Sequence, residues 1–128
     1  MEAYTKVFSV AVGGAFGAVA RYLINVSPLA TIFQNFPLPT LVINVIGSFL
    51  IGFLMIILTD RFEVSEAIRM AVIVGFLGAF TTFSTFEMEI YGLSSAREYP
   101  TAILYLLLSV VGGLLAVFAG VRLARLFV

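Results

Sequence analysis

Cysteine, histidine and tryptophan are all absent from the 128-residue sequence. Without them, the chain has no disulfides, no thiolate nucleophiles, no imidazole bases and none of the usual transition-metal ligands, so we expect no enzymatic activity. Charged residues are also scarce, at 11%, compared with about 25% in a typical soluble domain. Seven basic and seven acidic residues cancel, which gives no positive field to attract nucleic acid.

Hydrophobic residues dominate what is present. They make up 62% of the chain, and the mean hydropathy is +1.15. This composition predicts an integral membrane protein, and a chain of this length is expected to form one domain over residues 1–128. The first residues include an acid and make a poor signal peptide, so we expect the first apolar run to be retained in a multi-pass protein of the plasma or inner membrane.

The apolar residues fall into four runs that are each long enough to cross a bilayer. About 20 helical residues span about 30 Å of hydrocarbon. Ser27-Pro28 ends the first run, Ser65 is placed to cap the third helix, and Pro100 opens the fourth. The predicted spans are Val7–Val26, Thr40–Leu58, Ala67–Leu93 and Thr101–Leu123.

An even number of spans places both termini on one side of the membrane. The loop between the second and third spans lies on that side as well, and most basic residues belong to it, which favours cytoplasmic termini. Those residues are Lys6, Arg61, Arg69, Arg122 and Arg125, whereas Arg21 and Arg97 belong to the other side.

The third run contains an unusual segment, Gly75–Phe86, in which glycines are followed by hydroxyl residues and phenylalanines. A helix break at membrane depth is tolerated only where protein or a water-filled cavity surrounds it, so this segment is a candidate functional site. The alternative is that Gly75 and Gly78 only allow close helix packing. The attached sequence TTFSTF favours the functional interpretation.

Polar side chains also recur at every fourth position in the second span. Asn44 belongs to this stripe, and its amide could form an interhelical hydrogen bond or could face a pore and replace water around an anion. In the first span, Arg21 continues the spacing of Gly13 and Gly17. Its guanidinium could reach the membrane–water interface, or it could concentrate anions in a vestibule. Because Arg21 shares one helix face with the glycines, the second alternative is favoured.

Three blocks of sequence resemble one family, the small bacterial fluoride channels known as Fluc or CrcB. The resemblance covers essentially the whole chain, with the blocks in the family's order and spacing. The first block is Gly13–Ala18 with Arg21-Tyr22, the second is Thr40–Phe49, and the third combines Gly75–Gly78 with Thr81–Phe86.

The resemblance implies an all-α membrane protein of four transmembrane helices, with the third helix broken near mid-membrane. It further implies a dual-topology, antiparallel homodimer that exports fluoride passively through two pores around one central, structural sodium ion (Na+). The uneven distribution of basic residues leaves open a paired homologue of fixed opposite orientation.

Site residues are carried over from the same resemblance. Asn44 would be the pore amide, and Phe83 and Phe86 would form an aromatic box that contacts the ion through ring edges. Gly78 and Thr81 would offer backbone carbonyls to sodium. The residues on or near the polar track would be Ser84, Thr85, Glu89, Tyr105 and Ser109, with Arg21 in the vestibule.

Two other functions fit a small four-helix membrane protein. A proton-coupled exporter of the small multidrug type needs an intramembrane carboxylate, for which Glu89 is the only candidate. A non-transporting assembly subunit would need only the glycine stripes, and it leaves Asn44 and TTFSTF without a role. A passive channel is the simpler mechanism because no nucleotide-binding loop is present.

Overall fold

The computed structural model describes the whole chain, residues 1–128, and it contains helices and no strands. Four helical stretches are long and apolar enough to cross a membrane, as the sequence predicts. The first is α1 (Glu2–Asn25), which is followed by the short α2 (Leu29–Ile32). The second is α3 (Leu38–Ile56) with its π-helical continuation η1 (Ile57–Arg61), and the fourth is α7 (Tyr99–Ala124).

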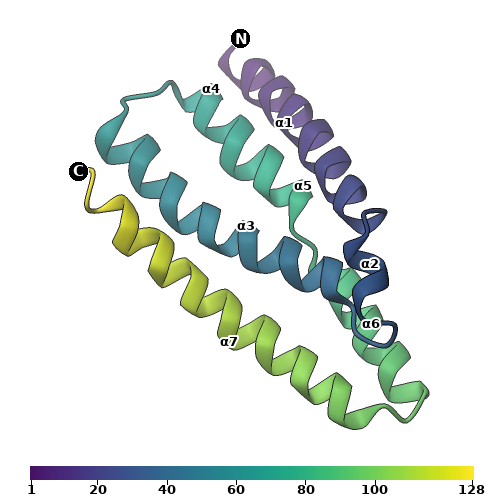
Figure 1. Cartoon of the computed structure of the whole chain (residues 1–128). Coiled ribbons are helices and arrows are strands. Elements are labelled where there is room, and N and C mark those ends of the chain that lie inside the picture. The colour runs from purple at the N-terminus through teal and green to yellow at the C-terminus, as the bar shows by residue number, and fades with distance from the viewer.

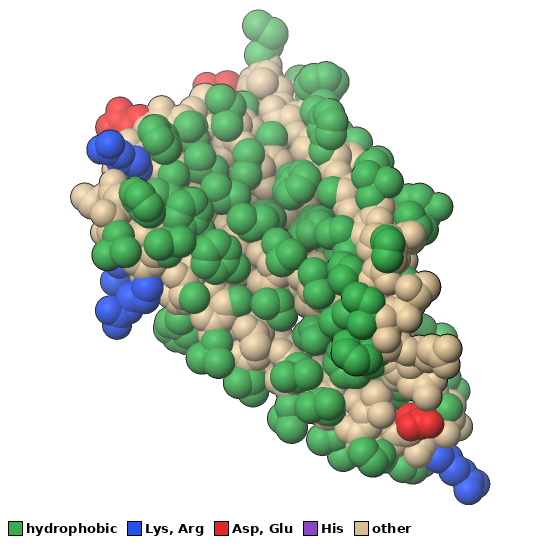
Figure 2. All heavy atoms as spheres, viewed as in Figure 1, with side chains coloured by type: hydrophobic (Ala, Val, Ile, Leu, Met, Phe, Trp, Pro, Cys, Tyr) green, Lys and Arg blue, Asp and Glu red, His purple; other side chains and the backbone are tan.

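The third stretch is composite. It consists of α4 (Glu66–Arg69), the π-helical η2 (Met70–Leu77), α5 (Gly78–Phe80) and α6 (Phe83–Ser95). Figure 1 shows that both termini and the loop between η1 and α4 lie at one end of the bundle, whereas the turn between α6 and α7 lies at the other. In Figure 2, hydrophobic side chains cover most of the visible face and charged ones gather at its ends. This distribution is that of a membrane-spanning bundle.

Helix α1 packs closely against η2 through glycines on both sides. A Cβ atom on Gly17 would collide with the backbone carbonyl of Phe76, and one on Gly75 would lie 2.6 Å from the carbonyl oxygen of Val10. Gly13 is buried in the same contact. Such backbone contacts drive helix association in lipid, where no hydrophobic force acts between helices. Gly75 therefore allows close helix packing and does not break the helix.

Helices α3 and α7 lie side by side along most of their lengths (Figure 1). Gly52 faces the backbone of Val117, and Gly120 faces the backbone of Phe49, with no room for a Cβ at either position. The bundle therefore consists of two glycine-mediated pairs, α1 with η2 and α3 with α7. At its break the third stretch passes from one pair to the other, since α5 contacts α1 and α6 contacts α7.

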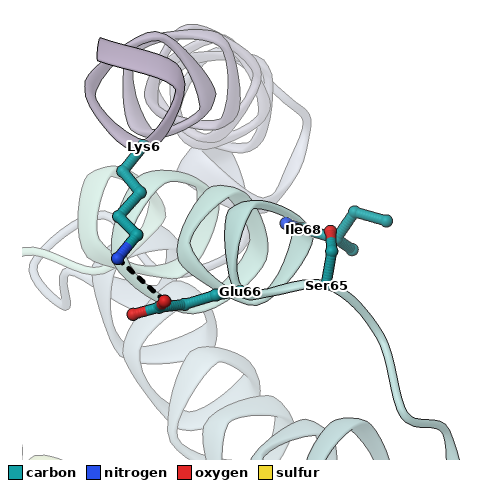
Figure 3. A network of polar contacts seen from close by, with 4 residues as sticks. All are labelled: Lys6, Ser65, Glu66 and Ile68. Carbon is teal, nitrogen blue, oxygen red and sulfur yellow. Dashed lines mark hydrogen bonds and ion pairs between the residues drawn. The ribbon is translucent and has the colours of Figure 1, made fainter. Parts of the chain in front are cut away.

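One ion pair links the first and third stretches near the end of the bundle where both termini lie. Lys6 Nζ lies 2.8 Å from a carboxylate oxygen of Glu66, as Figure 3 shows. The neighbouring Ser65 Oγ accepts a hydrogen bond from the Ile68 N–H, so Ser65 caps α4 as predicted. Because both charged side chains are partly exposed, the ion pair fixes the position of α4 beside α1 more than it adds stability.

The glycine contacts predict a contrast between two alanine substitutions. Gly17→Ala should destabilise the protein by about 1–3 kcal/mol, because the added methyl forces α1 away from η2. Gly92→Ala is the matched control, since a Cβ at Gly92 meets no heavy atom within 4 Å. Thermal unfolding in detergent measures both variants. Equal melting temperatures would contradict the close packing of α1 and η2.

Candidate functional site

The third stretch is interrupted at Thr81 and Thr82. Both residues are extended, Thr81 with ψ 155° and Thr82 with φ −149° and ψ 114°, between α5 and α6. The interruption lies inside the segment that the sequence singles out, but Gly75 and Gly78 stay helical. The threonines, and not the glycines, form the break.

The side chain of Asn44, on α3, holds the interruption open. Its Oδ1 accepts a hydrogen bond of 2.8 Å from the Thr82 N–H, and its Nδ2 donates one of 3.0 Å to the Thr82 carbonyl. The amide thus replaces both backbone partners that Thr82 would have in a helix. One N–H of the Asn44 amide remains for another acceptor.

Threonine hydroxyls form hydrogen bonds at both helix ends that border the interruption. Thr81 Oγ1 donates to the Leu77 carbonyl at 2.9 Å, at the end of the preceding helix. Thr82 Oγ1 accepts from the Thr85 N–H at 3.3 Å and also donates to Thr85 Oγ1 at 2.9 Å, which caps the start of α6. Gly47 on α3 leaves the space that the methyl of Thr81 occupies.

A pocket of about 440 Å³ opens beside the interruption. Ser109 on α7 contributes a buried Oγ with no hydrogen-bond partner, the single such side-chain atom in the chain. Ser48 and Thr82 also line the pocket, although the sequence did not identify them as site residues. The predicted site residues that line it are Asn44, Gly78, Thr81, Phe83, Phe86 and Ser109.

The two phenylalanines of the predicted aromatic box lie next to each other but differ in exposure. Their ring centroids are 5.8 Å apart with planes tilted by 49°. Phe86 is 6% exposed and contacts Tyr105 edge-on at 5.1 Å, whereas Phe83 is 71% exposed. The rings do not enclose a cavity within one chain, and Phe83 offers an open face to a neighbour.

Glu89 on α6 belongs to a second polar cluster. Its carboxylate accepts one hydrogen bond from Thr40 Oγ1 and one from the Tyr105 hydroxyl, each 2.7 Å long. Thr40 and Tyr105 are fully or almost fully buried. Thr40 is not among the predicted site residues, although its place four residues before Asn44 in the polar stripe is a signal that could have identified it.

Five predicted residues lie outside the pocket lining: Glu89 and Tyr105, which belong to the second cluster, and Ser84, Thr85 and Arg21. Ser84 is exposed next to Phe83, and Thr85 is bound to Thr82. Arg21 is partly exposed near the end of α1 and forms no ion pair. A single chain therefore does not bring Arg21 and Ser84 together with Asn44.

The predicted sodium ligands have carbonyl groups that fit a hard cation. The Thr81 carbonyl accepts no backbone hydrogen bond, and the Gly78 carbonyl lacks its usual donor because the Thr82 N–H is bound to Asn44. A Cβ on Gly78 would meet nothing within 4 Å, so this surface is open. Carbonyls freed by an unwound helix are suitable ligands for sodium. Two oxygens are too few to hold the ion, so the fit requires a second source.

Comparison with known proteins gives concordant matches. Residues 8–121 match the family described as CrcB-like protein, Camphor Resistance (CrcB). A protein of Methylococcus capsulatus named fluoride-specific ion channel FluC is 47% identical over 120 residues, which cover 94% of this chain and 53% of that protein. The proteins of the same name from Hydrogenovibrio crunogenus and Magnetococcus marinus are 43% and 44% identical, and the matches cover 92% and 95% of their lengths and 95% and 91% of this chain.

The hydrogen bonds to Thr82 predict that Asn44 stabilises the fold. Asn44→Ala leaves the buried N–H and carbonyl of Thr82 unpaired. The free energy of unfolding should therefore fall by about 1–3 kcal/mol for each group. Ser48→Ala, one turn further along α3, removes a hydroxyl that forms no hydrogen bond and is the control. Melting temperature and hydrogen exchange at the Thr82 amide are the measurements. Unchanged protection of that amide in Asn44→Ala would show that Asn44 does not hold the interruption.

Proposed function

The chain belongs to the CrcB-like family, and from this membership and the site beside Thr82 we propose that it is a fluoride channel through which fluoride leaves the cell passively. It is a multi-pass protein, and in bacteria its membrane is the inner membrane. The observation that carries the proposal is the pocket where the unpartnered Ser109 hydroxyl, the Asn44 amide and two phenyl rings converge.

The chemistry of the pocket suits a small, strongly hydrated anion. Moving such an ion into a medium of low dielectric costs tens of kcal/mol unless hydrogen-bond donors replace its water. The hydroxyl, the spare amide N–H and the electropositive ring edges are such donors. None of them is a fixed cation, so the ion can leave as well as enter.

On the far side of Phe86 from the pocket, the cluster of Thr40, Glu89 and Tyr105 supplies further polar groups for the pathway. In the present arrangement, the hydroxyls of Thr40 and Tyr105 both donate to the carboxylate. An anion that reaches this cluster competes with the carboxylate for these hydroxyls. Conduction past Tyr105 therefore requires Glu89 to release them.

Two antiparallel copies would complete what one chain leaves open. Phe83 is largely exposed, and the surface over Gly78 is unoccupied by the chain's own atoms. A second copy would cover both, and its Gly78 and Thr81 carbonyls would complete the oxygen ligands of one central sodium ion. The dimer would then have two pores, formed by two copies of this chain or by this chain and a homologue of opposite orientation.

A liposome assay tests the function directly. The reconstituted protein should release fluoride, measured with an ion-selective electrode, at the same rate with or without a proton gradient. Glu89 is the one carboxylate bound inside the bundle, so a proton-coupled exporter of the small multidrug type would act through it. A dependence of fluoride release on the proton gradient would favour that exporter, and no release at all would refute the channel.

The aromatic pair gives a sharper prediction. Phe83→Ile and Phe86→Ile should each remove most fluoride efflux, because isoleucine lacks the electropositive ring edge. The packing cost of such a swap is below about 1.5 kcal/mol, so size-exclusion elution should not change. Leu106→Ile, on the exposed side of α7, is the control and should conduct normally. Normal efflux in both phenylalanine variants would leave the pair with a packing role only.

The proposed cation site predicts that sodium stabilises the dimer. Replacing sodium by a bulky organic cation should lower the melting temperature, because an ion that binds only the folded dimer stabilises it by mass action. Cross-linking should capture antiparallel pairs, and isotope flux should detect no sodium transport. Equal stability without sodium would argue against a structural ion, even if fluoride conduction is normal.

A further inference from the structure

Phe36, in the loop between α2 and α3, extends the row of aromatic side chains beyond the proposed pathway. Its ring centroid lies 5.5 Å from that of Tyr105, with the planes at 81°. Tyr105 contacts Phe86, which contacts Phe83. The row therefore leads from the pocket beside the helix interruption to a loop, and Phe36 is its outermost member.

The ring of Phe36 packs edge-on against Tyr105, whose hydroxyl belongs to the cluster around Glu89. Tyr105 lies in the second turn of α7, at the end of the bundle remote from the termini, yet its side chain is 0% exposed. Its hydroxyl and that of Thr40 donate to Glu89. In Figure 1, α2 lies at this end of the bundle, with the loop that follows it leading into α3. A dry environment strengthens these charged hydrogen bonds.

The loop restricts the backbone next to Phe36. The Leu38 N–H donates to the Phe36 carbonyl at 2.8 Å, and Pro37 and Pro39 restrict the backbone on either side of Leu38. Phe33, three residues earlier in the loop, is instead 57% exposed and has no aromatic partner. Phe36 thus contacts the buried Tyr105, whereas Phe33 is a surface residue of the same loop.

We propose that Phe36 caps the outer end of the ion pathway and sets its selectivity by keeping water away from the Thr40, Glu89 and Tyr105 cluster. The proposal rests on the function proposed above. With the cap in place, an anion loses its water before it meets the two hydroxyls. Hydrogen bonds from these hydroxyls offset the free-energy cost of dehydration only for a small anion. Without the cap, water enters, and a larger anion such as chloride passes with part of its hydration shell.

Efflux of fluoride and of chloride from liposomes tests the cap. Phe36→Ala should release fluoride several-fold faster than the unmodified protein and should conduct chloride, which the unmodified protein should not. Phe36→Tyr keeps the ring and should behave like the unmodified protein, as should Phe33→Ala in the same loop. Size-exclusion elution shows that each variant is assembled.

Two results would overturn the cap. One is an unchanged ratio of fluoride to chloride efflux in Phe36→Ala, at any absolute rate, which would show that the ring only supports Tyr105. The other is a loss of selectivity in Phe33→Ala as well, which would show a general effect of loop packing. An unmodified protein that releases no fluoride would instead refute the channel itself, so the two failures are distinguishable.

A chemical rescue keeps the test independent of folding. The chain has no cysteine, so Phe36→Cys carries the only thiol. Benzyl methanethiosulfonate transfers a benzylthio group to that thiolate, forming a disulfide and releasing methanesulfinate, and so returns a phenyl ring to the loop. Modification should restore the exclusion of chloride, and dithiothreitol should abolish it again. Chloride conduction that persists after complete modification would contradict the cap.

Discussion

The paired hydrogen bonds between Asn44 and the backbone of Thr82 are the interaction on which the rest of the site depends. Inside a bilayer, an extended residue exposes an N–H and a carbonyl that cost several kcal/mol if they stay unpaired. A primary amide can satisfy both at once because it carries a donor and an acceptor side by side. Once Thr82 is held in this way, the Gly78 carbonyl loses its donor, and α6 can begin in a new direction.

The amide and the hydroxyls near the interruption divide between building the fold and facing the pocket. Thr81 and Thr82 use their hydroxyls to cap helix ends, and Asn44 uses one donor and one acceptor on Thr82. Ser109 makes no such bond although its oxygen is buried. A buried hydroxyl without a partner is costly in a passive packing role, which makes it a natural position for a transient ligand. In the proposed channel, the threonines at the interruption would therefore shape the pathway, whereas Ser109 and the spare N–H of Asn44 would meet the ion.

Sequence reasoning found the four spans, the segment that contains the interruption and six of the residues that line the pocket. Apolar run length and small-residue spacing are local properties, so they can be read directly. It did not find the interruption at Thr81 and Thr82, since Gly75 is the stronger helix breaker and only the contact with Val10 shows why it stays helical. It also missed Thr40 and Phe36, because their partners Glu89 and Tyr105 lie far away in the chain.

The glycine-mediated pairs explain why so small a chain can support a broken helix. Close backbone contacts fix η2 against α1 and α7 against α3, so the segments around the interruption are held by packing that does not involve its own hydrogen bonds. The interruption is therefore free to keep carbonyls and a surface open at Gly78. A single chain leaves that surface and Phe83 without a partner, and in lipid an open polar backbone is stable only against protein, water or an ion. The second copy proposed above would satisfy the same constraint that makes Asn44 necessary: every backbone group freed by the break must find a partner.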